Sequence, residues 1–133
     1  MRILFAAHQF FPEHRAGTEV LTLWLARALR ARGHEAAVFA AKRSAPFTDL
    51  RPGETEDYVV EGVPVRRIGR PEESLSRPYR LNYDNPRMAE GMREAVSSFR
   101  PDVVHFMHLQ GLSAGAIPVV KEEFGLPALY TAT

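Results

Sequence analysis

A short segment near the N-terminus carries groups that suit an anion. Ala16, Gly17 and Thr18 stand directly ahead of a helix-like run, and Glu19 follows them. A glycine lets the backbone approach a phosphate closely, and the first turn of a helix offers amide groups and the positive end of its dipole. A turn glycine ahead of a helix explains the same residues, and the segment alone favours that simpler interpretation. With one glycine and no following lysine, it is neither the dinucleotide-binding fingerprint nor a Walker-type loop.

His108 is the second candidate, because it follows the strand-like run 102–107. A neutral imidazole at the end of a strand can hydrogen-bond a sugar hydroxyl or act as a base, whereas a loop histidine with one backbone hydrogen bond is the open alternative. His105 lies inside the run, where side chains alternate between faces, so we expect a structural role for it and no metal ion shared by the pair. We expect no role at the site for the other histidines, which are His8, His14 and His34.

The segment from residue 66 to residue 87 holds six arginines against three acidic residues. This local excess of positive charge suits a phosphorylated acceptor or anionic lipid headgroups, but the pattern favours a solvated loop. Tyr79 and Tyr83 lie between the arginines and offer rings on which a sugar can stack. The arginines are Arg66, Arg67, Arg70, Arg77, Arg80 and Arg87.

Alternating apolar runs and helical spacings predict the elements that position these residues. The continuous apolar run at 3–7 predicts a strand covered on both faces, and a second apolar run at 35–41 predicts another strand. The spacing from Thr18 to Arg32 predicts a helix between them. Such a unit is parallel and right-handed. The same reasoning predicts a helix opening at Asn85-Pro86, a strand at 102–107, a helix ending at Phe124 with a late start or kink at Pro118, and a strand at 126–131.

Residues 58–68 interrupt this alternation with a hairpin. Two short strands turn at Glu61-Gly62, and we expect Pro64 to keep the second strand at an edge of the sheet. The whole pattern predicts an α/β fold, a doubly wound, mostly parallel, Rossmann-like sheet with an inserted β-hairpin. In such sheets ligands lie beyond the carboxyl ends of the strands. We therefore expect the loop after the first strand and the segments 105–113 and 131–133 to line one cleft.

The composition limits both the size of the protein and its partners. With 133 residues, 45% of them hydrophobic and 25% charged, the chain is one ordinary globular domain. A net charge of +1 gives no global field for nucleic acid, so no partner of that kind is expected. The absence of cysteine excludes disulfides and a cysteine nucleophile and fits a reducing compartment, with the cytoplasm as the default.

Two further features concern the setting of the chain. No stretch approaches the roughly 20 apolar residues of a membrane-spanning helix, so we expect any membrane contact to be peripheral. The chain ends at or just after a predicted strand, with no closing helix behind it, and we therefore expect a piece of a longer chain.

Two sets of short motifs follow one another along the sequence. The first set is Met1-Arg2-Ile3-Leu4-Phe5, Phe11-Pro12, Ala16-Gly17-Thr18-Glu19, Leu25-Ala26-Arg27-Ala28-Leu29 and Arg32-Gly33-His34-Glu35. The second set is Pro101-Asp102-Val103-Val104-His105, His108, Gly111-Leu112-Ser113, Gly125-Leu126-Pro127 and Tyr130-Thr131. In order and spacing these motifs resemble the amino-terminal domain of family 4 glycosyltransferases over nearly the whole chain.

The resemblance implies one half of a GT-B enzyme, in which two Rossmann-like domains enclose a nucleotide-sugar donor and an acceptor. It implies that the loop of Ala16, Gly17 and Thr18 lies against the diphosphate of the donor, with Phe10 and Phe11 forming the floor of the cleft. The acceptor is then a sugar, a lipid-linked molecule or another small molecule. No metal ion or other cofactor is implied, because the nucleotide-sugar is a substrate.

The resemblance also assigns roles to single residues. His108 corresponds to a position that contacts the transferred sugar or assists catalysis, and Thr133 corresponds to one that touches the acceptor. Many family members have Gly-Gly where this chain has Ala16-Gly17, which puts the donor contact in question, because a methyl group lies where backbone approaches the phosphate. Many also have histidine where Ala132 stands, which shifts more weight onto His108.

The leading hypothesis is the acceptor-side domain of a retaining glycosyltransferase of carbohydrate biosynthesis. We expect it in the cytoplasm, with peripheral contact to the inner face of the membrane. The carboxy-terminal domain, which in the family carries most nucleotide contacts and a paired-glutamate motif, is absent from residues 1–133, so we expect that this chain alone transfers no sugar. The alternative is a non-catalytic Rossmann-like module that binds a nucleotide or a protein.

Overall fold

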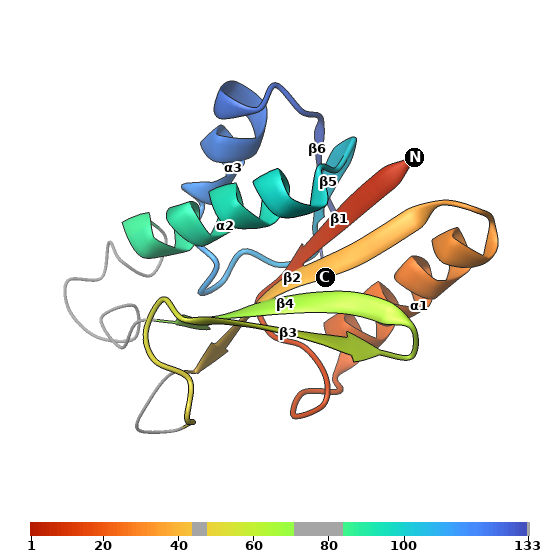
Figure 1. The fold of residues 1–133 in the computed structure, drawn as a ribbon, viewed down its shortest axis with the longest axis horizontal. Coiled ribbons are helices and arrows are strands. Elements are labelled where there is room, and N and C mark those ends of the chain that lie inside the picture. The colour runs from red at the N-terminus through yellow and green to blue at the C-terminus, as the bar shows by residue number, and fades with distance from the viewer. Residues whose placement is uncertain (44–47, 71–83, 133) are drawn as a thin grey trace.

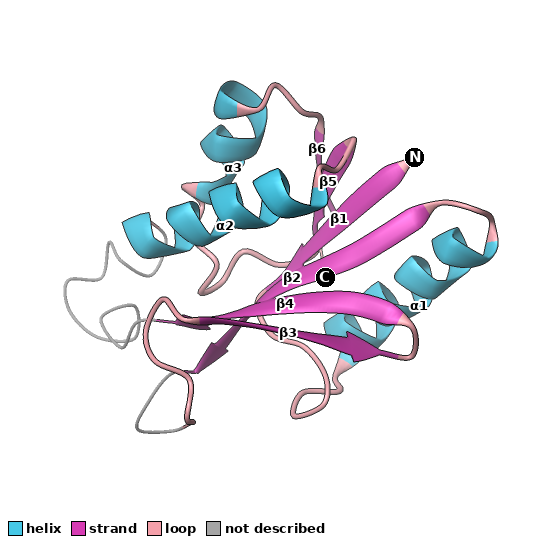
Figure 2. Cartoon of the chain, in the orientation of Figure 1, coloured by secondary structure: helices cyan, strands magenta, loops and turns pink. Residues whose placement is uncertain are grey.

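The computed structural model describes residues 1–43, 48–70 and 84–132, and its centre is a six-stranded sheet with the order β3-β4-β2-β1-β5-β6 (Figure 1). The strands from β4 to β6 in this order are parallel to one another, whereas β3 is antiparallel to β4 (Figure 2). The strands are β1 (Arg2–Ala7), β2 (Glu35–Arg43), β3 (Thr55–Val60), β4 (Val63–Arg70), β5 (Val103–Phe106) and β6 (Ala128–Tyr130). The predicted doubly wound, mostly parallel sheet is confirmed.

Helices cover both faces of the sheet, with α1 (Gly17–Ala31) on one face and α2 (Pro86–Phe99) and α3 (Ala116–Pro118) on the other (Figure 1). From Ile3 to Ala7, strand β1 is apolar because it lies under both layers. Ile3 belongs to the core cluster on the α1 side, and Leu4 belongs to the cluster on the α2 side. The continuous apolar run in the sequence therefore reflects burial on two faces.

The ends of the two long helices follow from their capping residues. Helix α1 ends just ahead of Gly33, whose φ of 89° is in the left-handed region that suits glycine. Helix α2 begins after Asn85, whose side chain accepts a hydrogen bond from the backbone N–H of Arg87, and Pro86 is its first residue. Both helices are confirmed to within about two residues of the predicted bounds.

The last helical segment is irregular, as Pro118 predicted. Helix α3 is a single turn that ends at Pro118 and continues as the π-helical turn η3 (Val119–Glu123). Proline cannot donate an N–H within a helix, which favours a change of winding at this position. The segment ends at Gly125, which has a φ of 65°.

The hairpin of β3 and β4 extends the sheet on one side. Its turn residues Glu61 and Gly62 have positive φ values of 48° and 83°, as two-residue hairpin turns require. The prediction that Pro64 keeps the second strand at the edge is wrong, because β4 lies between β3 and β2. Pairing of β4 with β2 begins at Val65, so the missing N–H of Pro64 lies outside that ladder.

Within the described part of the chain, no helix has both the length and the apolar character that a membrane crossing demands.

Candidate functional site

Two histidines meet at the carboxyl edge of the sheet. Ala6 of β1 pairs with Phe106 of β5, and the same register continued by two residues brings His8 level with His108. The two imidazole rings stack with their centroids 4.2 Å apart and their planes inclined by 37°. The loops after β1 and β5 therefore adjoin each other, as expected, and His8, for which the sequence indicated no role, lies beside the candidate His108.

A backbone hydrogen bond fixes the chemistry of His108. The N–H of Gln110 donates to Nδ1 of His108 over 3.2 Å. Since Nδ1 accepts this bond, the hydrogen of the neutral ring is on Nε2. His108 can thus donate a hydrogen bond to a ligand through Nε2–H, and in this tautomer it has no lone pair left to act as a base.

His8 is half-buried and neutral. Its Nδ1 is buried and makes no hydrogen bond with any described residue. Burial, followed by the nearby ring of His108, lowers the pKa of His8 below its ordinary value of 6.5, and Glu19 opposes the shift. The ring is therefore uncharged near pH 7 in the absence of a ligand.

Glu19 connects this pair of rings to the start of α1. It is only 1% exposed, and its Oε1 accepts a hydrogen bond from the side-chain amide of Gln9 over 2.6 Å. Its Oε2 is also buried and has no hydrogen-bond partner among the described residues. The positive end of the α1 dipole favours a carboxylate in this first turn.

The predicted phosphate loop lies at the same helix terminus. Ala16 is the residue before α1, it has extended backbone, and it makes no side-chain capping bond. Gly17 is the first residue of α1, and a Cβ atom placed there would meet nothing within 4 Å. Because Gly17 also has no left-handed φ, the fold itself gives no reason for a glycine at this position. Thr18 follows within the first turn.

Arg70 brings positive charge to this edge from β4. The loop after β5 requires glycine at Gly111, which has a φ of 75° and whose added Cβ would lie 2.5 Å from Nη1 of Arg70. The Arg70 side chain therefore lies directly against the loop that follows His108, and its charge also acts on His8.

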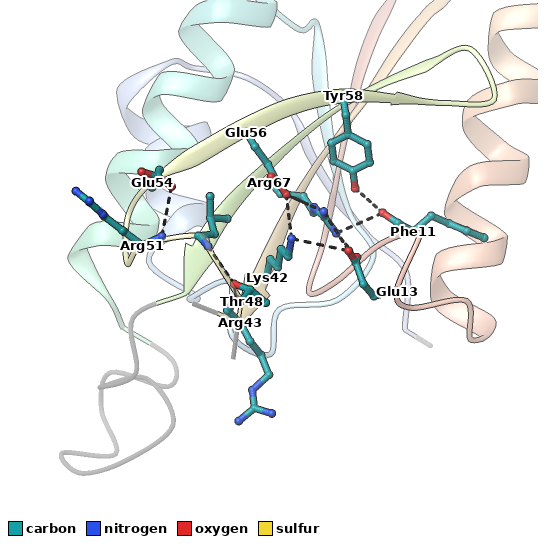
Figure 3. Close-up of polar contacts among 11 residues, drawn as sticks. Phe11, Glu13, Lys42, Arg43, Thr48, Arg51, Glu54, Glu56, Tyr58 and Arg67 are labelled. Atoms are coloured by element: carbon teal, nitrogen blue, oxygen red, sulfur yellow. Dashed lines mark hydrogen bonds and ion pairs between the residues drawn. The ribbon is translucent and has the colours of Figure 1, made fainter. Parts of the chain in front are cut away.

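The first arginines of the arginine-rich segment lie in a strand and not in the solvated loop that the sequence favoured. Arg67 lies in β4, is 5% exposed, and forms ion pairs with Glu13 and Glu56 (Figure 3). Its guanidinium carbon lies 4.6 Å from the centroid of the Tyr58 ring. Arg66 is in the same strand and pairs with Asp57. Arg77, Arg80, Tyr79 and Tyr83 lie outside the described residues.

The contacts of Arg67 fasten the loop after β1 to the hairpin. Arg67 and the hydroxyl of Tyr58 both donate to the backbone carbonyl of Phe11 (Figure 3). Lys42 from β2 lies 3.8 Å from Glu13 and 3.4 Å from Glu56. The loop that leads from His8 to Gly17 is thus attached to the hairpin at two successive points.

The aromatic pair before Pro12 is divided between core and loop. Phe10 is fully buried in the cluster under α1, so it does not line an open surface as the resemblance implied. Phe11 is partly buried and packs edge-on against Phe10, with ring centroids 5.3 Å apart.

His105 has the structural position that alternation predicted. Its Nε2 forms a 2.6 Å hydrogen bond with Oγ1 of Thr131, and its ring lies 5.4 Å from that of Phe5. Burial lowers the pKa of His105. This contact joins the ends of β5 and β6, whereas Thr133, the predicted acceptor contact, lies outside the described residues. Among the described residues, no three histidine, aspartate or glutamate side chains gather closely enough to hold a metal ion.

Two surface hollows lie away from the paired histidines. One of about 550 Å³ lies between α1 and the hairpin and includes Trp24, Val59 and Arg15. Another of about 390 Å³ lies on the α2 side and includes Phe99, Tyr58 and Arg66. Neither hollow is lined by His8 or His108.

The sequence matches a family model, and the fold is similar to that of a solved structure. A family model described as "Glycosyl transferase 4-like domain" matches residues 16–132. Among solved structures, the catalytic domain of starch synthase IV from Arabidopsis thaliana bound to ADP and acarbose has a similar fold, with a TM-score of 0.59 and 18% sequence identity. The match covers 96% of this chain but only 32% of that chain. No curated protein matches the sequence.

Proposed function

The chain belongs to the family of glycosyl transferase 4-like domains, and from this premise we propose that it is the acceptor-side domain of a retaining glycosyltransferase. The enzyme moves a sugar from a nucleotide-sugar donor to an acceptor, which is a sugar, a lipid-linked molecule or another small molecule. The α/β fold of this chain corresponds to one half of a GT-B enzyme. The ADP that the starch synthase structure holds supports a nucleotide-linked donor for this proposal.

One observation carries the proposal, namely that the start of α1 and His108 are connected through His8. The ring of His8 stacks on His108 at 4.2 Å, and Glu19 in the first turn of α1 acts on His8 electrostatically. The connection lies beyond the carboxyl ends of β1 and β5, which is where open α/β sheets bind ligands. Anion-binding and hydrogen-bonding groups therefore face one surface.

In the proposed complex, the diphosphate lies against Ala16, Gly17 and Thr18. A ligand explains why residue 17 is glycine, since the fold does not require one. The amide groups and dipole of α1 stabilise the negative charge that grows on the departing diphosphate. Nε2–H of His108 donates to a hydroxyl of the transferred sugar and holds it in the reactive orientation.

The proposal extends to parts that the described residues do not include. A carboxy-terminal domain supplies most nucleotide contacts, so the 133-residue chain alone transfers no sugar. Thr133 contacts the acceptor, and the reaction uses no metal ion or other cofactor. Nucleic acid is not a partner. A cytoplasmic location with peripheral contact to the inner face of the membrane stays a prediction.

Nuclear magnetic resonance titration of the isotope-labelled chain with UDP-glucose and ADP-glucose tests the donor site. We expect the largest amide shifts at Gly17, Thr18 and the loop after His108. Shifts that avoid all three positions would contradict the proposal, and shifts centred on the hollow beside Trp24 would favour a binding module. Sugar transfer by residues 1–133 alone would overturn the need for a second domain.

The stereochemistry of the reaction needs the full-length enzyme. With a panel of sugar and lipid-linked acceptors, we expect the product to keep the anomeric configuration of the donor. A product of inverted configuration would show that the assignment as a retaining enzyme is wrong, without affecting the family assignment.

A further inference from the structure

We propose that His8 is a second donor-recognition residue, which takes up one proton when the diphosphate of a nucleotide-sugar binds and contacts it as an imidazolium. This inference rests on the proposed function of the same site. His8 directly follows β1, it is partly exposed at the carboxyl edge, and its ring lies 4.2 Å from that of His108. A diphosphate against the start of α1 therefore has an imidazole on each of the two adjoining strand ends beside it.

The two imidazoles differ in which of them can gain a proton. Nδ1 of His108 accepts the N–H of Gln110, so protonation there would break an existing hydrogen bond. Nδ1 of His8 makes no hydrogen bond with any described residue, so a proton on it breaks nothing. The added proton therefore goes to His8.

A nearby acid would balance the charge of a protonated His8. Oε2 of Glu19 is buried without a hydrogen-bond partner among the described residues, and Glu19 already acts on His8 electrostatically. An Nδ1–H on His8 would face the interior, where Glu19 supplies the balancing negative charge. Nε2 of a protonated His8 is then left to donate to a phosphate oxygen at the carboxyl edge.

The surroundings of His8 explain why it is uncharged until an anion binds. His108 after β5, His14 in the loop before α1 and Arg70 at the end of β4 disfavour a positive charge on His8, and Glu19 on α1 is the one acid among these four groups. Burial acts in the same direction as the two histidines and Arg70. A bound diphosphate adds the negative charge that this edge lacks and so raises the pKa of His8.

The sign of the effect follows from proton linkage. The bound state holds one more proton than the free state, so affinity rises as the pH falls. The pH range in which affinity changes has the raised pKa of ligand-bound His8 as its upper limit. Its lower limit is the pKa of free His8, which lies below 6.5. Inside this range one proton taken up per ligand gives on the order of a tenfold gain in affinity for each pH unit.

The experiment is a titration of the labelled chain with UDP-glucose and with ADP-glucose between about pH 5.5 and 8, the range over which histidine titrates. The diphosphate of both probes is esterified at each end and does not itself titrate in this range. Imidazole nitrogen shifts report the protonation of His8, and the amide shift of Gly17 reports binding. We expect both ring nitrogens of His8 to be protonated when the site is saturated with ligand. The dissociation constant should decrease as the pH is lowered.

The matched variants are His8→Asn and His34→Asn. His34 lies at the opposite end of the sheet, beside the N-terminal amine, so its replacement should leave the pH dependence unchanged. His8→Asn should remove that dependence while its folded amide spectrum is retained. If the amide of Gly17 shifts on ligand addition but the affinity of His8→Asn still depends on pH as in the wild type, the proton-uptake inference fails and the donor site stands. If neither probe moves Gly17 at any pH, the donor site itself fails.

Discussion

Replacing Arg67 by methionine tests whether the hairpin is bound to the loop after β1 through a buried charge. Arg67 is 5% exposed and contacts Glu13, Glu56 and the ring of Tyr58. Methionine keeps much of the apolar volume of the side chain but removes the guanidinium. The change therefore isolates the charge and its hydrogen bonds from the packing of the aliphatic part.

The expected loss of unfolding free energy is intermediate between the values for a buried and a surface ion pair. Breaking a fully buried pair costs about 3–5 kcal/mol, because one charge is left without a partner. Here the side chains of Glu13 and Glu56 are 45% and 37% exposed, so water and the nearby Lys42 compensate in part. We expect a loss of about 2 kcal/mol at neutral pH.

The loss should depend on pH. Burial would raise the pKa of Glu13, but the hydrogen bond and charge of Arg67 outweigh it and hold this pKa below its ordinary value of 4.5. A lowered folded-state pKa contributes stability that is present above 4.5 and is lost as the pH falls through the folded-state value. The difference between the wild type and Arg67→Met should therefore be largest near neutral pH and shrink in acid.

Urea unfolding followed by circular dichroism measures both effects. Arg66→Met is the matched control, because Arg66 is the neighbouring residue of β4 and its partner Asp57 is 64% exposed. We expect that control to lose less than about 1 kcal/mol. Equal losses in the two variants, or a loss in Arg67→Met that does not change between neutral and acid pH, would refute the reasoning.

Three other substitutions test the site and the fold. Gly17→Ala should leave thermal stability unchanged or raise it by up to about 1 kcal/mol, because the position is open and helical, yet it should weaken nucleotide-sugar binding in titrations. Asn85→Ala should lower the urea midpoint by the equivalent of about 1–2 kcal/mol, because the N–H of Arg87 loses its cap. Gly91→Ala should lower the free energy of unfolding by about 1–3 kcal/mol in the same assay, because the added methyl would lie 2.5 Å from Cδ1 of Ile68. Helix propensity alone implies a gain in stability, and such a gain would contradict the packing argument.

The sequence predicts most elements because their signals are local. The apolar run at the start of β1 indicates burial on two faces, and Asn85-Pro86 indicates the start of α2 by capping. Pro118 indicates the irregular last helix in the same way. Each of these signals depends on residues within one or two turns of one another, so no knowledge of the tertiary fold is needed.

The position of the hairpin in the sheet could not be predicted from such local signals. Pro64 indicates an edge strand only if the whole strand pairs on both sides, and the pairing of β4 with β2 begins one residue later. Arg67 appeared to belong to a solvated segment because its partner Glu13 is 54 residues away. Charge counts along the chain do not show which arginine has a carboxylate across the fold.

His8 is the site residue that sequence reasoning missed, although a signal for it exists. It follows the first strand as His108 follows β5, and adjacent parallel strands end at the same edge of a sheet. What the sequence did not supply was that β1 and β5 are neighbours. Once the strand order is known, two histidines at matching distances beyond the paired residues are expected to meet.

The contacts of the hairpin explain how a loop can hold two site residues, His8 and Gly17, in a defined geometry. Loops position functional groups well only when a rigid scaffold holds them. The loop from His8 to Gly17 is held at Phe11 by the hydroxyl of Tyr58 and at Glu13 by Arg67, and both of these side chains come from the hairpin. The inserted hairpin therefore does more than widen the sheet, since it fixes the segment that joins the imidazole pair to the first turn of α1.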